Sequence, residues 1–160
     1  TLLALSFSLL GDCLLMFVDQ SSQFFISGLI AFLIAHVFYI IVFLKSRNKS
    51  KSPFGFIMLM LIYGLGLFYL LKNGLADMLI PVVIYMLVIL TMSTSSFLRR
   101  GKVSHISFNL VFLGAILFMI SDSLLALNKF YKPLPWSDIS IMLTYALAQL
   151  SLVFGILKQQ

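Results

Sequence analysis

Residues 23–44 read QFFISGLIAFLIAHVFYIIVFL, an apolar run that contains no Asp, Glu, Lys or Arg. An α-helix needs about 20 such residues to cross the hydrocarbon core of a bilayer, so this run predicts a transmembrane helix. Comparable runs occur at residues 1–18, 54–72, 75–97, 103–127 and 138–158. We therefore predict an all-α, polytopic transmembrane helix bundle with six spans, in which residues 1–160 form a single transmembrane domain.

The composition supports a membrane protein. Hydrophobic residues make up 61% of the chain and charged residues only 10%, with a mean hydropathy of +1.10. Soluble domains are about a quarter charged. The net charge of +6 does not indicate a nucleic-acid partner, because the basic residues lie in short segments between the spans. Cys13 is the only cysteine, which excludes an intrachain disulfide and a Cys-based zinc site, and we expect no cofactor.

The basic residues predict the orientation of the spans. One face of the bundle would carry Lys45, Arg47, Lys49, Lys51, Arg99, Arg100, Lys102 and Lys158, and the other Lys72, Lys129 and Lys132. Basic loops prefer the cytoplasm, so the first face and the C-terminus are expected there. The chain starts at Thr1 within an apolar run, from which we expect an N-terminally truncated domain.

Two aspartates interrupt the apolar runs in matching surroundings, Leu-Gly-Asp12-Cys-Leu-Leu and Ile-Ser-Asp122-Ser-Leu-Leu. A carboxylate in such a segment costs several kcal/mol unless it is protonated, paired or in a wet cavity. Both lie about 8–9 Å inside the non-cytoplasmic ends of parallel spans, so we expect them in one layer of the bundle. A duplication or chance would explain the matching surroundings, and both explanations stay open.

Other intramembrane polar residues are candidates for binding or orienting a substrate. Ser8 lies four residues before Asp12, on the same helix face, and is expected to hydrogen-bond its carboxyl. His36 lies mid-span with Tyr39 on its face. It is expected to pair with either aspartate or hold a phosphate, although the helical rise places it about 10 Å deeper. The remaining candidates are Ser121, Ser123, Tyr145 and Gln149, and the polar residues Tyr85 and Ser93 are also expected to line a cavity. For each serine, hydrogen bonding between helices is the alternative role.

Two further expectations concern a metal and a proline. Asp12, His36 and Asp122 are together the only set that would bind a metal, and two histidines with one cysteine do not supply a classical zinc site, so no metal is predicted. Pro81 lies within the first two turns of the span at residues 75–97, where it is expected to kink the helix.

The ordered motifs resemble the YhhN-type family of membrane lysoplasmalogenases. They are Phe7 to Leu15 with Asp12, then Gly28, Ala35-His36 and Tyr39, then Gly114-Ala115, Phe118, Ser121-Asp122-Ser123 and Lys129, and finally Tyr145 and Ala148-Gln149. The resemblance covers nearly the whole chain. It implies about eight spans in a full-length protein, of which six are present here. It also implies that Asp12 and Asp122 are the catalytic residues.

What the resemblance implies about activity is hydrolysis of the vinyl ether bond of lysoplasmalogen to a fatty aldehyde and glycerophosphoethanolamine or glycerophosphocholine. One carboxyl would donate a proton while the other, ionised, stabilises the cation, as carboxyl pairs do at glycosidic bonds. The expected partners are a lysophospholipid substrate and membrane lipid, in a bacterial inner membrane or the endoplasmic reticulum. The alternatives are a proton- or cation-coupled transporter that uses the same acids, and a scaffold without chemistry.

Overall fold

The structure, a computed structural model, describes residues 1–50 and 52–159, and this part of the chain is helical without strands. The helices are α1 (Leu2–Leu15), α2 (Ser22–Lys45), α3 (Phe54–Leu71), the short 3₁₀ helix η1 (Ala76–Met78), α4 (Leu79–Phe97), α5 (His105–Phe130) and α6 (Ser137–Leu157). The predicted all-α class with six helices is confirmed. Lys51 of the predicted basic loop lies outside the described residues.

Five of the helices, α2 to α6, are long and apolar enough to cross a membrane, which fits a multi-pass membrane protein. Helix α1 is shorter than the predicted run of residues 1–18. It has 14 residues and covers about 21 Å, because the chain turns away after Leu15. Pro81 is the third residue of α4, where a backbone N–H would have no acceptor within the helix. The proline therefore breaks no hydrogen bond of α4, and the reason for expecting a kink does not apply.

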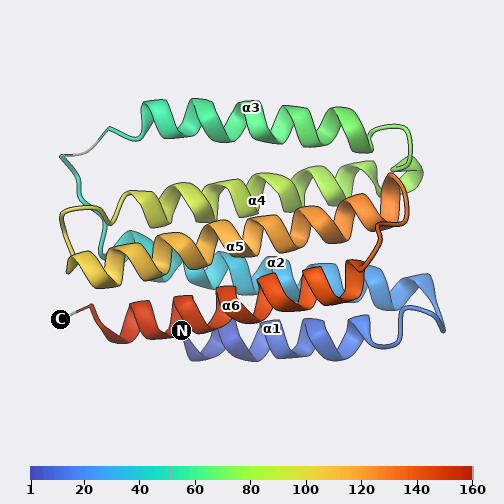
Figure 1. Cartoon of the computed structure of the whole chain (residues 1–160), viewed down its shortest axis with the longest axis horizontal. Coiled ribbons are helices and arrows are strands. Elements are labelled where there is room, and N and C mark those ends of the chain that lie inside the picture. Colours follow the sequence, from blue (N-terminus) through green and yellow to red (C-terminus); the bar gives the residue numbers. More distant parts are fainter. Residues whose placement is uncertain (51, 160) are drawn as a thin grey trace.

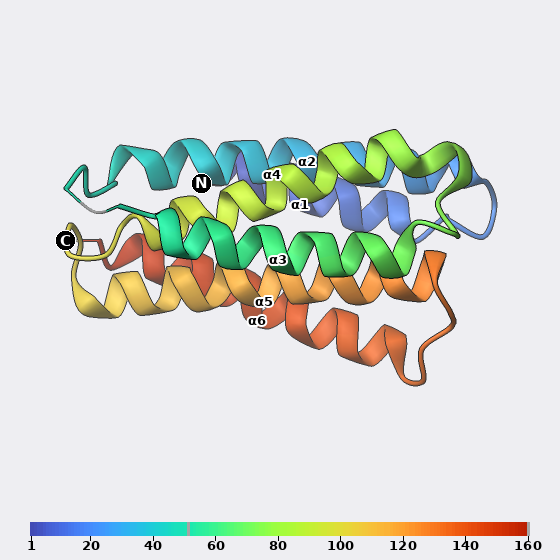
Figure 2. The ribbon, with the colours of Figure 1, turned by 90° about the horizontal axis from the view of Figure 1, so that it is seen from above.

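The helices run along a common axis and reverse direction from one to the next (Figures 1 and 2). Helix α1 packs on α2 and α5 on α6, while α4 contacts both α2 and α5; α3 lies outermost, against α4 and α5. Small residues bring α5 and α6 together. A Cβ atom added at Gly114 would lie 2.9 Å from the carbonyl oxygen of Ala148, and one at Gly155 would lie 2.8 Å from the backbone nitrogen of Val111.

The α1–α2 pair and the α5–α6 pair face each other without backbone contact. Among the described residues, no Cα atom of α1 lies within 8 Å of one in α6, and none of α2 within 8 Å of one in α5. Side chains therefore fill the space between the two pairs. They include the buried rings of Phe32, His36 and Phe118. This interior layer also receives the two aspartates.

The basic segments meet at one end of the bundle, as the charge pattern predicts. The backbone N–H of Asn48 donates to the carbonyl of Leu98 at 2.7 Å, and Ser104 donates to the carbonyl of Lys158 at 2.9 Å. Arg99 is fully buried here and donates to Ser107 at 3.2 Å. Burial lowers the pKa of its guanidinium to about 10. The two loops and the end of α6 thus form one connected surface.

Candidate active site

The Asp122 carboxyl of α5 is held by a tyrosine of α4. The Tyr85 hydroxyl donates to Asp122 Oδ2 at 2.5 Å. Tyr85 is buried, and the Asp122 side chain is 14% exposed. A hydrogen bond from a neutral donor satisfies a carboxyl oxygen in apolar surroundings without adding a second charge. Asp122 is therefore fixed by the α4–α5 contact.

His36 lies beside the same carboxyl oxygen. Its Nε2 atom is 3.7 Å from Asp122 Oδ2, which is too long for a hydrogen bond. The ring is fully buried and makes edge-on contacts with Phe118 at 4.6 Å and Tyr85 at 5.4 Å between ring centroids. We expected His36 to lie about 10 Å closer to the cytoplasmic end than the aspartates. For Asp122 this expectation is wrong. Helix α2 extends beyond the end of α5, and this stagger brings the two residues level (Figure 1).

Asp12 of α1 belongs to a separate chain of hydrogen bonds. The Tyr145 hydroxyl of α6 donates to Asp12 Oδ2 at 2.8 Å and accepts from Gln149 Nε2 at 3.2 Å. Gln149 Oε1 in turn accepts from the Tyr39 hydroxyl of α2 at 2.8 Å. Every donor in this chain points toward Asp12, so the bonds polarise one another in the same sense. The structure thus joins Tyr39, Tyr145 and Gln149 to Asp12.

Aromatic rings connect the surroundings of the two acids. The Phe118 ring lies between Tyr145, 5.3 Å away, and His36, 4.6 Å away. The Phe32 ring contacts Tyr145 at 5.8 Å and Phe118 at 6.3 Å. No hydrogen bond joins the two carboxyls within the described residues. Each carboxyl has its own tyrosine, and one aromatic cluster separates them.

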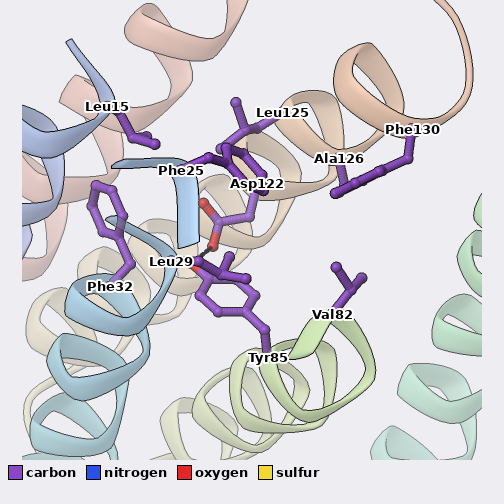
Figure 3. Close-up of a pocket in the computed structure, with 10 residues that line it drawn as sticks. All are labelled: Leu15, Phe25, Leu29, Phe32, Val82, Tyr85, Asp122, Leu125, Ala126 and Phe130. Atoms are coloured by element: carbon purple, nitrogen blue, oxygen red, sulfur yellow. Dashed lines mark hydrogen bonds between the residues drawn. The ribbon is translucent and has the colours of Figure 1, made fainter. Parts of the chain in front are cut away.

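Asp122 faces a cavity of about 420 Å³ toward the non-cytoplasmic end predicted from the charges. The other walls are apolar except for the Tyr85 hydroxyl, and Figure 3 shows this hydroxyl and the carboxyl pointing toward each other. The lining residues are Leu15, Phe25, Leu29, Phe32, Val82, Tyr85, Asp122, Leu125, Ala126 and Phe130. Asp12 does not line this cavity. A single acid at the wall of an apolar cavity suits a substrate that is largely apolar and reacts at one atom.

None of the predicted serines forms a hydrogen bond with either aspartate. The Ser8 hydroxyl is buried and has no hydrogen-bond partner in the described chain, so its expected bond to Asp12 is wrong; the carboxyl is turned toward Tyr145 instead. Ser121 donates to the carbonyl of Ile141 at 3.0 Å and links α5 to α6. Ser123 donates to the carbonyl of Met119 and forms a 2.7 Å hydrogen bond with Tyr63 of α3. Both have the helix-linking role that was the alternative.

The site prediction misses Tyr63 and expects Tyr85 only as a polar residue that lines a cavity, not as the hydrogen-bond partner of Asp122. Both are hydroxyl-bearing residues in apolar spans, but nothing in the sequence indicates which helix they face. The described residues contain no group of three His, Cys, Asp or Glu side chains close enough to hold an ion. Asp12, His36 and Asp122, the one set considered for a metal, do not form such a group.

Comparison with known proteins agrees with the motifs. Human lysoplasmalogenase TMEM86B is 31% identical over 155 residues, which cover 97% of this chain and 62% of that protein. Human lysoplasmalogenase TMEM86A is 33% identical, covering 91% and 60%, and pig lysoplasmalogenase TMEM86B is 31% identical, covering 91% and 58%. The chain thus spans about three-fifths of these relatives. No solved structure matches. The model of the YhhN family matches residues 1–156, and the chain belongs to that family.

Proposed function

We propose that this chain is part of an integral-membrane lysoplasmalogenase, which hydrolyses the vinyl ether bond of a lysophospholipid. The observation that carries the proposal is the Asp122 carboxyl, held by Tyr85 at the wall of an otherwise apolar cavity. A vinyl ether reacts by gaining a proton on carbon, which requires an acid beside that carbon, and the alkenyl chain attached to it suits apolar walls. The names of the relatives point to the same reaction.

Asp122 is proposed as the acid because its carboxyl, unlike that of Asp12, lines the cavity. In the first step its proton is transferred to the β-carbon of the vinyl ether, and the alkenyl oxygen becomes part of an oxocarbenium ion. Water then adds to the α-carbon and returns a proton to the carboxylate. The hemiacetal breaks its bond to the glycerol oxygen, which gains a proton, and releases fatty aldehyde and glycerophosphoethanolamine or glycerophosphocholine. Hydrogen bonding from Tyr85 would stabilise the carboxylate formed in the first step.

Asp12 is proposed as the second, ionised carboxyl. Its half-buried position, next to the Tyr145 hydroxyl, suits a carboxylate that stays charged and stabilises positive charge across the aromatic cluster, while Asp122 handles the proton. The three donors from Tyr39, Gln149 and Tyr145 support the charged form. His36 is proposed to position the Asp122 carboxyl, since its ring packs against both Tyr85 and Phe118.

The orientation belongs to the same proposal. Basic loops and the C-terminus on the cytoplasmic side would place the Asp122 cavity toward the opposite face, in a bacterial inner membrane or the endoplasmic reticulum. The lysophospholipid would then enter from the membrane, with its headgroup near that face.

Incubation of the purified chain with lysoplasmalogen, with aldehyde release as the readout, tests the proposal. Asp122→Asn and Asp12→Asn are each expected to lower kcat by roughly 10²–10⁴-fold, the usual contribution of an acid or base. Asp138→Asn is the matched control, because Asp138 is exposed at the start of α6. Normal activity in both variants would refute the carboxyl mechanism. Proton-coupled uptake into proteoliposomes without lipid turnover would favour the transporter.

A further inference from the structure

The Asp122–Tyr85 pair lies between two cavities. Besides the cavity of Figure 3, a second one of about 310 Å³ lies toward α3, and both are lined by Val82, Tyr85, Asp122 and Ala126. The second cavity also reaches Met86 of α4 and Leu71 of α3. The Asp122 carboxyl therefore has hollows on two sides.

An apolar groove runs between α3 and α4 beside the second cavity. We call it the α3–α4 groove, and its central part of about 550 Å³ is lined by Leu61, Gly64, Leu65, Phe68, Val83, Met86, Leu87 and Leu90. Met86 also lines the second cavity, so the two spaces adjoin. Leu61, Leu87 and Leu90 also line a further hollow of about 800 Å³ that reaches Leu98. From Tyr85 to Leu98 the helical rise is about 20 Å.

The groove offers almost no hydrogen bonds. Its central part has no polar side chain. The hollow beyond it includes Thr91, Thr94 and Ser95, but each hydroxyl donates to a carbonyl of its own helix at 2.7–2.8 Å. A headgroup would lose its hydrogen bonds with water here, whereas a hydrocarbon chain would lose nothing. The groove thus suits an alkyl chain.

The absence of a side chain at Gly64 keeps the groove deep. Gly64 is buried, and a Cβ atom added to it would lie 2.7 Å from Cδ1 of Leu90 across the groove. Two residues later, Gly66 is exposed, and a Cβ atom added there would meet nothing within 4 Å. Two glycines of one helix therefore face different surroundings. A larger residue would narrow the groove at Gly64 and would not at Gly66.

We propose that the α3–α4 groove binds the alkenyl chain of the lipid, with the vinyl ether at Asp122. The proposal rests on the proposed function. Met86 lines both the groove and the cavity beside the reacting carboxyl, and this proximity identifies the occupant, because the alkenyl chain begins at the bond that is cleaved. The groove therefore sets the preference for chain length.

The test compares Gly64→Leu with Gly66→Leu in the full chain. Aldehyde release is measured with vinyl ether lysophospholipids that carry eight-carbon or sixteen-carbon chains. Binding of saturated-ether analogues of both lengths is measured in parallel, because they cannot be hydrolysed. Gly64→Leu is expected to lower kcat/KM and analogue affinity for the long chain by roughly tenfold relative to the short chain, as steric changes in apolar pockets do. Gly66→Leu is expected to behave like the unaltered protein.

Leu61→Phe narrows the same groove from a partly exposed position and serves if Gly64→Leu does not fold. The groove proposal would be overturned if the folded variants changed kcat/KM and analogue affinity equally for both chain lengths, or did not change them. Aldehyde release by the unaltered protein would in that case still support the reaction. If the unaltered protein releases no aldehyde, the reaction is wrong, and analogue binding alone decides whether the groove holds a chain.

Discussion

Replacing Tyr85 with Phe removes one hydrogen bond and nothing else from the proposed acid. The ring stays, so the cavity wall and the 5.4 Å contact with His36 are preserved. What disappears is the donor 2.5 Å from Asp122 Oδ2. The proposed first step leaves a negative charge on this carboxyl in a site that is 14% exposed, where solvent replaces the donor only poorly.

The size of the effect follows from the charge of the acceptor. A hydrogen bond to a charged group contributes about 1.5–3 kcal/mol, and one to a neutral group about 0.5–1.5 kcal/mol. If the bond strengthens as the charge develops, the barrier rises by about 1–2 kcal/mol. Tyr85→Phe is then expected to lower kcat roughly five- to thirtyfold, since 1.36 kcal/mol corresponds to tenfold. The free energy of unfolding should fall by about 1 kcal/mol.

Aldehyde release under saturating substrate gives kcat, and thermal unfolding in detergent gives the stability. Tyr63→Phe is the matched control, because it also removes a tyrosine hydroxyl with a short hydrogen bond, to Ser123 at 2.7 Å, but not one to an acid. It should lose stability to a similar degree and keep its kcat. A folded Tyr85→Phe protein with unchanged kcat, or equal losses of kcat in both variants, would refute the role of this donor.

The remaining predictions concern the second acid, the packing of α5 on α6 and the cavity mouth. The chain of donors to Asp12 predicts a graded loss of kcat, largest in Tyr145→Phe, smaller in Gln149→Leu and smallest in Tyr39→Phe; a reversed order in steady-state kinetics would contradict it. Gly155→Ala should lower the free energy of unfolding by about 1–3 kcal/mol through the clash with Val111, whereas Gly66→Ala should not, as thermal unfolding can verify. Lys129 has its Nζ 5.3 Å from the centre of the Phe25 ring that lines the cavity, so Lys129→Met should raise KM about fivefold through loss of an exposed charge interaction with the lipid phosphate. Lys132→Met, beside Tyr131, should leave KM unchanged, and equal effects of both would exclude a specific contact.

The helices could be predicted from the sequence because bilayer thickness fixes their length. Hydropathy alone locates all six, and the ends of α2, α3 and α6 lie within a residue of the predicted ones. The stagger between helices could not be predicted, because hydropathy indicates the depth of each span in the membrane and not its offset from the neighbouring helices. That is why His36 was expected at another depth than Asp122, although 3.7 Å separates the two side chains.

The candidate site was only partly predictable for a related reason. The aspartates stand out because an acid is costly in an apolar span, and this argument needs no knowledge of neighbours. The hydrogen-bond partners of the two aspartates could not be predicted, because they are far away in the sequence. Tyr85 is 37 residues from Asp122 and Tyr145 is 133 residues from Asp12. The i−4 rule instead pointed to Ser8, whose hydroxyl lies in the same helix as Asp12 and does not bond to it.

The matching motifs around Asp12 and Asp122 conceal an asymmetry that only the fold reveals. Asp122 has one tyrosine donor and faces cavities on both sides. Asp12 accepts from the end of a three-residue chain of donors and does not line the cavity of Figure 3. Two carboxyls in contact can divide the roles by sharing one proton, but two separated carboxyls in identical surroundings would gain and lose protons over the same pH range, so a separated acid–base pair needs such a difference. Since the local sequences are alike, the difference comes from α4 and α6. Tyr85→Phe removes the donor to Asp122, and Tyr145→Phe removes the donor to Asp12. These substitutions therefore test the division of roles more directly than changing the acids themselves.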